Sequence, residues 1–192
     1  MSQQATTICL KNNIILQKNK KDKRFNLFFS VENNKSPINN VINMSICHLI
    51  GSTNPDIVEN VEIIDVVDPD KEINLLIKLK PIFKELGMLR YFMSVKTTKF
   101  EENGMVSFKT EDLPGEQSLQ GYTRVPHNVS TLSVKTLSNN RLAINHNFEV
   151  DISDFVPSHM NNVIAMLVKK IFHNFKNYIE NIGAGEIHDC GC

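Results

Sequence analysis

The strongest hydrophobic pattern in the chain lies near its C-terminus. Between positions 160 and 182, apolar residues recur at steps of three and four: Met160, Ile164, Leu167, Ile171, Phe175, Tyr178 and Ile182. This spacing places them on one stripe of a helix. Pro157 suits the first turn of that helix, and Ser153 or Asp154 can cap its N-terminus. The pattern predicts one amphipathic helix of about 26 residues, roughly 39 Å long.

Most of the preceding chain has the patterns of β-strands. We expect strands over residues 6–17, 24–32, 58–68, 73–80, 89–100, 105–110, 122–125, 130–137 and 141–150. Asp68-Pro69-Asp70 and Asn103-Gly104 have the residue types of tight turns, so each should join two antiparallel neighbours. Strands connected mainly by hairpins predict an antiparallel meander.

A short helix should interrupt the strands early in the chain. Ser36 can act as its N-cap, Pro37 fits its first position, and an imperfect apolar face continues to about Leu49. The turn-forming residues 51–55 should end it.

This order of elements predicts an α+β fold of the helix-grip type, in which a curved antiparallel sheet wraps around the long C-terminal helix. The helix must bury its apolar stripe, and an antiparallel sheet can cover that stripe with one face while its other face stays in water. We expect a single domain over residues 1–182, followed by a flexible tail over residues 183–192.

Composition and charge restrict the function. The 192 residues are 41% hydrophobic and 22% charged, as in ordinary globular domains. A formal net charge of zero argues against nucleic-acid binding, and the basic run 18–24 is interpreted as a solvated turn. The sequence shows neither a secretory signal nor an apolar run long enough to span a membrane. We expect a cytoplasmic monomer whose membrane contact is at most peripheral and transient.

The reactive residues do not form a recognisable catalytic or metal motif. The six histidines are scattered, and His146 with Glu149 on one expected strand is separated by an odd offset that points the two side chains to opposite faces. We therefore predict no catalytic residues, no metal site and no cofactor. Cys9 and Cys47 should pack as small apolar residues.

The last residues allow three interpretations. The plainest is an exposed tail with reduced thiols. Alternatively, the terminal Cys190 and Cys192 resemble the double-prenylation signal of Rab-type GTPases, which makes lipidation of these two residues a hypothesis. Metal binding by His188 together with both cysteines is the third interpretation, although a closed zinc site usually needs four ligands.

Three segments resemble those of the START lipid-transfer domains, within the helix-grip superfamily that includes birch-pollen allergens and polyketide cyclases. Residues 89–95 resemble a strand that carries an Arg-Asp pair, with Arg90 in place and Tyr91 replacing the Asp. Residues 114–125 resemble a strand that is entered by a Gly and carries an Arg, here Arg124.

The third segment runs from the last strand through Asp151 to Pro157, and resembles the bend before the family's C-terminal helix. The resemblance covers roughly residues 58–182. The N-terminal part, in which a strand precedes a short helix, is more similar to the allergen-like branch.

The resemblance implies a non-enzymatic protein that binds or transfers a lipid or sterol in a hydrophobic cavity between the sheet and the C-terminal helix. The candidate lining residues are Met160, Ile164, Leu167, Ile171 and Phe175 from the helix, and Phe92, Phe108, Tyr122, Leu132 and Phe148 from the sheet. Candidates for a polar end of the cavity are Arg90, Arg124, Glu149 and Asp151. The same apolar residues could instead fill a solid core, so two alternatives stay open: an adaptor domain of the same fold without a ligand, or a cyclase-like enzyme.

Overall fold

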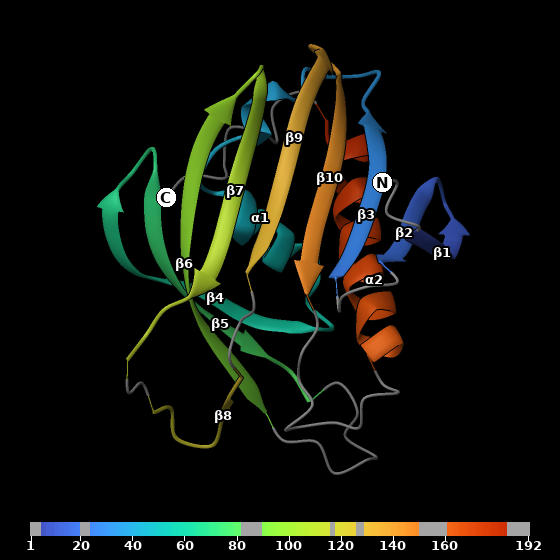
Figure 1. Cartoon of the computed structure of the whole chain (residues 1–192). Helices are drawn as coiled ribbons and strands as arrows, with labels where there is room; N and C mark the ends of the chain where they lie inside the picture. Colours follow the sequence, from blue (N-terminus) through green and yellow to red (C-terminus); the bar gives the residue numbers. More distant parts are fainter. Residues whose placement is uncertain are drawn as a thin grey trace.

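A large curved sheet is the central element of the protein (Figure 1). The computed structural model describes residues 5–19, 24–81, 90–115, 118–125, 129–149 and 161–183. The strands are β1 (Ala5–Lys11), β2 (Ile14–Asn19), β3 (Arg24–Glu32), β4 (Val58–Asp68), β5 (Glu72–Leu79), β6 (Tyr91–Glu102), β7 (Met105–Asp112), β8 (Thr123–Arg124), β9 (Ser130–Ser138) and β10 (Arg141–Glu149). The helices are the short 3-10 helix η1 (Asn39–Val41), α1 (Ile46–Ser52) and α2 (Asn161–Asn181).

The strand order confirms the predicted antiparallel meander. The strands follow the order β1-β2-β3-β10-β9-β7-β6-β5-β4, and only the two-residue β8 pairs in parallel, with β6. Strands that follow one another in the chain are neighbours, except at the connection from β3 to β4 and on both sides of β8. The last strand, β10, pairs with β3 along its whole length, from Arg141 opposite Glu32 to Glu149 opposite Arg24. Both α1 and α2 lie on the same side of the sheet, which we name the inner face (Figure 1). The helix-grip architecture is thus confirmed.

The first predicted strand is instead a hairpin. Residues 6–17 were expected to form one strand, but β1 and β2 pair with each other across Asn12 and Asn13. These two residues have φ angles of 58° and 57°, the left-handed conformation that a tight hairpin turn requires and that asparagine tolerates. An Asn-Asn pair between apolar runs was the available signal in the sequence.

The predicted short helix is present, but it begins later than expected. Within residues 36–49 the chain first forms η1, and α1 begins at Ile46 and continues to Ser52. Asparagine side chains compete for the backbone: the Oδ1 atom of Asn33 accepts the N–H groups of Lys35 and Ser36, at 2.8 and 3.0 Å. The hydroxyl of Ser36, the expected cap, has no hydrogen-bond partner among the described residues. Local side-chain bonds of this kind replace the regular helical ladder.

The long C-terminal helix is present as α2, but its most buried face differs from the predicted stripe. The buried side chains are Ala165, Lys169, Phe172, Phe175, Lys176, Ile179 and, just past the helix, Ile182. This face is rotated from the predicted stripe by about one residue position, roughly 100° around the axis. Tyr178 is exposed, whereas Phe175 and Ile182 are buried as predicted. The expected caps and Pro157 lie outside the described residues.

Buried polar side chains hold α2 against the rest of the molecule. The Nδ2 atom of Asn33, which is fully buried, donates to the carbonyl oxygens of Ile179 and Ile182, at 2.8 and 3.0 Å. These carbonyls end the helix and have no partner within it, so the amide takes the place of a C-cap. Lys176 donates to the carbonyl of Ser30 at 2.9 Å. Ser30 directly follows Phe29, the last residue of β3 that pairs with β2.

The other helix, α1, packs closely on the edge strand β4. A Cβ atom added to Gly51 would lie 2.5 Å from Cγ2 of Val61, closer than side chains tolerate. Asn54, fully buried just after α1, donates to the carbonyl of Ile171 at 3.1 Å and accepts from Asn174 at 2.9 Å. The α1 segment is therefore fixed both to β4 and to α2.

Replacing Asn33 should destabilise the whole domain. In Asn33→Ala, two helix-end carbonyls and two loop amides lose their buried partner, so we expect the free energy of unfolding to fall by about 2–4 kcal/mol. Urea denaturation followed by circular dichroism measures this change. Asn60→Ala is the matched control, because Asn60 is exposed and bonds only Glu62; a similar loss in both variants would contradict the role given to Asn33.

Gly51→Ala should destabilise the protein through a steric clash with Val61. Overpacking of this kind typically costs about 1–3 kcal/mol. In a double-mutant cycle, the same substitution should cost less when Val61 is already Ala, because the clashing Cγ2 atom is gone. Chemical denaturation of the four proteins gives the coupling energy, and an equal cost in both backgrounds would show that the contact is not the cause.

Candidate functional site

The inner face of the sheet is tightly filled across β3, β10, β9 and β7. Phe108, Leu132, His146 and Leu27 lie opposite one another across four strands, and Phe108 and Leu132 are buried. On the same face, Phe148 stacks on Phe25 with ring centroids 5.5 Å apart. The predicted site residues Phe108, Leu132, Phe148 and Phe175 all belong to this solid part of the core.

The inner face is less completely covered at the other end of the sheet. Val61, Ile77 and Met93 lie opposite one another across β4, β5 and β6, so they form one row on one face. All three touch the core but remain only partly buried. The sequence analysis missed this row, because the register of β5 with β6 depends on a long connection whose geometry the sequence does not fix.

Cys47 of α1 points at the same region. Burial, opposed in part by a hydrogen bond to Thr97, raises the pKa of the Cys47 thiol to about 11. Thr97 belongs to the inner face of β6, where its hydroxyl lies 3.3 Å from that of Thr110. Cys47 nevertheless keeps part of its surface accessible. We name the region bounded by Cys47, Thr97 and the row of Val61, Ile77 and Met93 the β4–β6 space.

One side of α2 faces the α1 segment. Ile164, Leu167 and Ile171 are half-buried on the flank of the helix, and the carbonyl of Ile171 accepts the hydrogen bond from Asn54 that joins α2 to the α1 segment. These three predicted site residues therefore do not pack in the centre of the core, but flank it. Met160, a fourth predicted helix residue, lies outside the described residues.

Arg124 lies where β7 ends and β8 begins, both beside β6. Its Nη2 atom donates to Asp112 at 2.9 Å and to the carbonyl of Leu113 at 2.8 Å. Its Nε atom is buried and has no hydrogen-bond partner among the described residues. A buried N–H group without a partner is unfavourable unless a further acceptor arrives. Arg124, one of the residues predicted for a polar end of the cavity, thus carries a buried donor without a partner among the described residues. Asp151, another of them, lies outside the described residues.

Three predicted site residues lie elsewhere. Phe92 pairs with Lys78 and is offset by one residue from Met93, so it faces the outer side of the sheet and not the space beneath the helices. Arg90 stacks over the ring of Tyr122 at 5.7 Å. Burial, together with a hydrogen bond to Glu59, raises the pKa of Tyr122. Because successive side chains of a strand point to opposite faces, Phe92 cannot line the same face as Met93.

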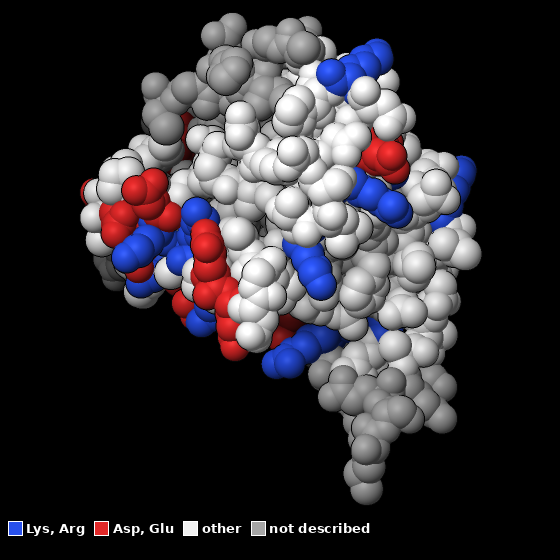
Figure 2. Space-filling model, turned by 90° about the horizontal axis from the view of Figure 1, so that it is seen from above, with Lys and Arg blue, Asp and Glu red and all other residues white. Residues whose placement is uncertain are grey.

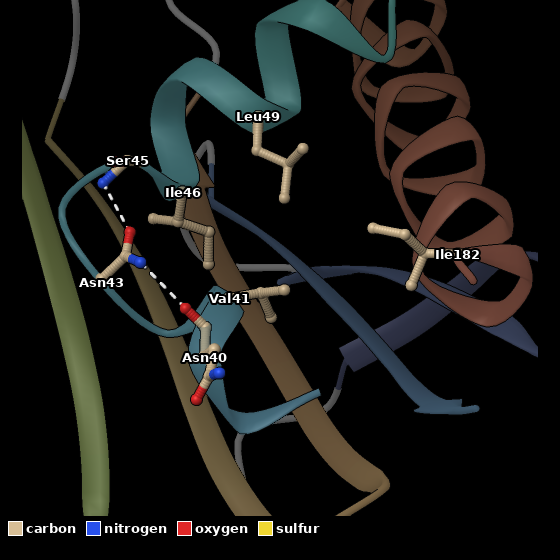
Figure 3. A pocket seen from close by; sticks show the side chains of 7 residues that line it. All are labelled: Asn40, Val41, Asn43, Ser45, Ile46, Leu49 and Ile182. Carbon is tan, nitrogen blue, oxygen red and sulfur yellow. Dashed lines mark hydrogen bonds between the residues drawn. The ribbon is translucent and has the colours of Figure 1, made fainter. Parts of the chain in front are cut away.

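A small cavity near the end of α2 is too small for a lipid. Figure 3 shows it between the η1–α1 segment and Ile182, with Val41, Ile46 and Leu49 on its walls. Its volume of about 40 Å³ corresponds to one or two water molecules. Asn43, which bonds the carbonyl of Asn40 and the N–H of Ser45, shapes its rim (Figure 3).

The described residues do not bring together three side chains that could ligate a metal ion. His146 is held by ring contacts with Phe148 and Phe172, at 4.9 and 4.7 Å between centroids. The tail residues Cys190 and Cys192 lie outside the described part of the chain. Among the helices described, none is both long and apolar enough to cross a membrane.

Comparison with solved structures identifies the fold. The chain is similar to the human StarD13 (DLC2) lipid transfer and protein localization domain, with a TM-score of 0.71, 14% identity and coverage of 94% of this chain and 91% of that one. It is similar to human STARD10, with a TM-score of 0.73, 8% identity and coverage of 91% and 72%.

A bacterial structure gives the same result. The STAR-related lipid transfer protein from Xanthomonas axonopodis matches with a TM-score of 0.71 and 10% identity, over 91% of this chain and 98% of that one. The sequence matches no protein-family model, and no curated protein matches it significantly. The chain therefore has the helix-grip fold of START domains, established by shape at very low sequence identity.

The raised pKa of Cys47 predicts slow thiol chemistry. At pH 8 only roughly one thiol in a thousand should be ionised, because the pKa is about 11. In a variant in which Cys9, Cys190 and Cys192 are Ser, the rate of alkylation by iodoacetamide should keep rising beyond pH 10. The same variant in denaturant should level off above pH ~8.5, the ordinary thiol pKa. A plateau near pH 9 in the folded protein would contradict the buried position.

Proposed function

We propose that this START-like domain binds an apolar ligand, a lipid or sterol, in the β4–β6 space between the sheet and the two helices. The observation that carries the proposal is the contrast between the two ends of the inner face. Phe108 and Leu132 are buried, whereas Val61, Ile77 and Met93 keep accessible surface although they lie on the face of the sheet that carries the helices.

The chemistry of the surrounding residues supports the proposal. A ligand pocket is mostly apolar with a few polar groups that orient the ligand. Ile164, Leu167 and Ile171 would supply the apolar wall on the α2 side. Thr97 and Thr110 add hydroxyl groups on the inner face.

The proposal includes binding or transfer without catalysis. Two of the similar structures are lipid transfer proteins or domains, and at this level of identity the similarity supports the fold alone. Within the described part of the chain, the His146 ring stacks on Phe148 and packs against the tilted ring of Phe172. A lipid carrier must exchange its ligand with a membrane, so transient membrane contact belongs to the proposal.

Tryptophan substitutions on α2 provide a direct test, because the chain contains no tryptophan of its own. Leu167→Trp places a large ring on the flank that we assign to the site, and Met166→Trp places it at the adjacent exposed position as the control. We expect Leu167→Trp to lower uptake of a fluorescent sterol, phospholipid or fatty acid by about tenfold, since the ring fills ligand volume. Met166→Trp should leave uptake unchanged.

The new tryptophan is also the reporter. Its emission should be blue-shifted in Leu167→Trp and should change when the remaining ligand binds, whereas the control should resemble tryptophan in water. Native mass spectrometry of the unaltered protein should detect co-purified lipid. An empty protein that takes up no member of the lipid panel would favour the adaptor alternative with a filled core, and equal uptake by both variants would remove Leu167 from the site.

A further inference from the structure

The edge strand β4 has features of a docking surface on the opposite side of the molecule from α2. The strand ends the sheet order, and no described residue pairs with its free side. Its backbone N–H and C=O groups on that side are therefore available to another strand. Free edges of this kind are the sites at which extended peptides add to a sheet.

The apolar side chains of β4 are unusually exposed for a strand of this length. Ile63, Ile64, Val66 and Val67 are 48%, 44%, 48% and 57% exposed. The opposite edge strand, β1, carries a single large hydrophobic residue of comparable exposure, Leu10. Ile63 and Val66 lie on the inner face, opposite Leu75 and Ile73, and Ile64 borders the outer face. Exposed aliphatic side chains therefore flank the free edge on both faces, as at an interaction site.

A groove continues this patch onto the outer face of the sheet. Its volume is about 450 Å³, and its walls include Ile64 of β4, Leu76 of β5, Phe92 of β6 and Leu119 of the loop before β8. Phe92 is almost completely buried at its floor. The groove is separate from the β4–β6 space, because Phe92 and Leu76 point to the face away from the helices.

The charges of β4 define the chemistry of a partner. All four charged residues of the strand are acidic: Glu59, Glu62, Asp65 and Asp68. The carboxylate of Glu62 forms an ion pair with Lys78 at 2.6 Å, and the carboxylate of Asp65 has no such partner among the described residues. Figure 2 shows charged side chains gathered on the side of the molecule where Figure 1 places the β4–β5 hairpin, with much of the remaining face uncharged.

We propose that β4 and the adjoining groove bind an extended segment of a partner protein in which basic and apolar residues alternate. The backbone of the segment would pair with β4. Its basic side chains would lie on the groove face, beside Glu62 and Asp65, with their aliphatic stems over Phe92. Its apolar side chains would lie on the other face, beside Ile63 and Val66. A second copy of the chain fits less well, because antiparallel pairing of two β4 strands would bring acidic residues together. An anionic membrane is repelled by the same charges.

The bulges of β4 limit the length of the paired segment. The register shifts on either side of the stretch from Asn60 to Ile63, which pairs regularly with residues 75–78 of β5. Regular addition of a new strand is therefore confined to about this stretch, since bulges disrupt the edge on both sides. The remaining affinity must come from the exposed aliphatic side chains and the groove.

Synthetic peptides test the proposal on the full chain. The probe is a short peptide that alternates lysine and valine, and the controls are an equally charged peptide interrupted by prolines and a glutamate–valine peptide. We expect the lysine–valine peptide to bind at least about tenfold more tightly than either control, because proline cannot donate to the ladder and glutamate meets like charge. Hydrogen exchange should slow in residues 58–68 on binding.

Two substitutions locate the site. Ile64→Lys removes an exposed aliphatic side chain and reverses the local charge, so it should weaken peptide binding by about tenfold or more. Leu10→Lys makes the same change at the opposite edge and should have no effect. Thermal unfolding confirms that both variants remain folded.

Four outcomes would overturn the proposal. They are equal binding of the proline-interrupted peptide, unchanged exchange in residues 58–68, self-association of the chain that Ile64→Lys abolishes, or binding to vesicles of phosphatidylcholine with phosphatidylserine that Ile64→Lys abolishes. The last two would assign the surface to a second copy or to a membrane. None of these results depends on whether the β4–β6 space takes a lipid.

Discussion

The position of α2 depends on buried hydrogen bonds to backbone carbonyls as much as on its apolar face. The side chain of Asn33 donates to the carbonyls at the end of α2, and the side chain of Asn54, just after α1, donates to the carbonyl of Ile171 in the middle of α2. Lys169 and Lys176, both buried, donate to the carbonyls of Lys11 and Ser30. An apolar stripe can slide or rotate on a sheet at little energetic cost, whereas a buried amide has one geometry in which all its bonds are made.

This anchoring divides the inner face into two parts with different roles. Because α2 is held over β2 and β3, its Phe172 packs with aromatic residues of the sheet, such as Phe25 and Phe148, in a solid core. The opposite end of the sheet is covered by the short helix α1, which approaches Val61 closely at Gly51. Val61 and Met93 nevertheless remain only partly buried there. A short helix covers less area than a long one, so the incomplete coverage that supports a ligand site follows from the brevity of α1.

The two proposed sites use opposite faces of the same three strands. Met93 and Phe92 are adjacent in the chain, yet one faces the helices and the other floors the outer groove. A ligand between sheet and helices and a peptide at the β4 edge could therefore be bound at the same time. Any energetic coupling between them would pass through the side-chain packing of β4, β5 and β6.

The sequence by itself determined the elements whose signals are local. The alternation in residues 24–32 and 58–68, the Asn103-Gly104 turn and the repeat after residue 160 each predicted an element that the structure contains. Side-chain competition for the backbone around Asn33 moved the start of the early helix to Ile46, because these bonds depend on where the loop folds. Which face of α2 is most buried, and whether Phe92 or Met93 points inward, was decided only in the tertiary structure. Both depend on strand register and helix rotation, which are set by contacts between residues far apart in the chain.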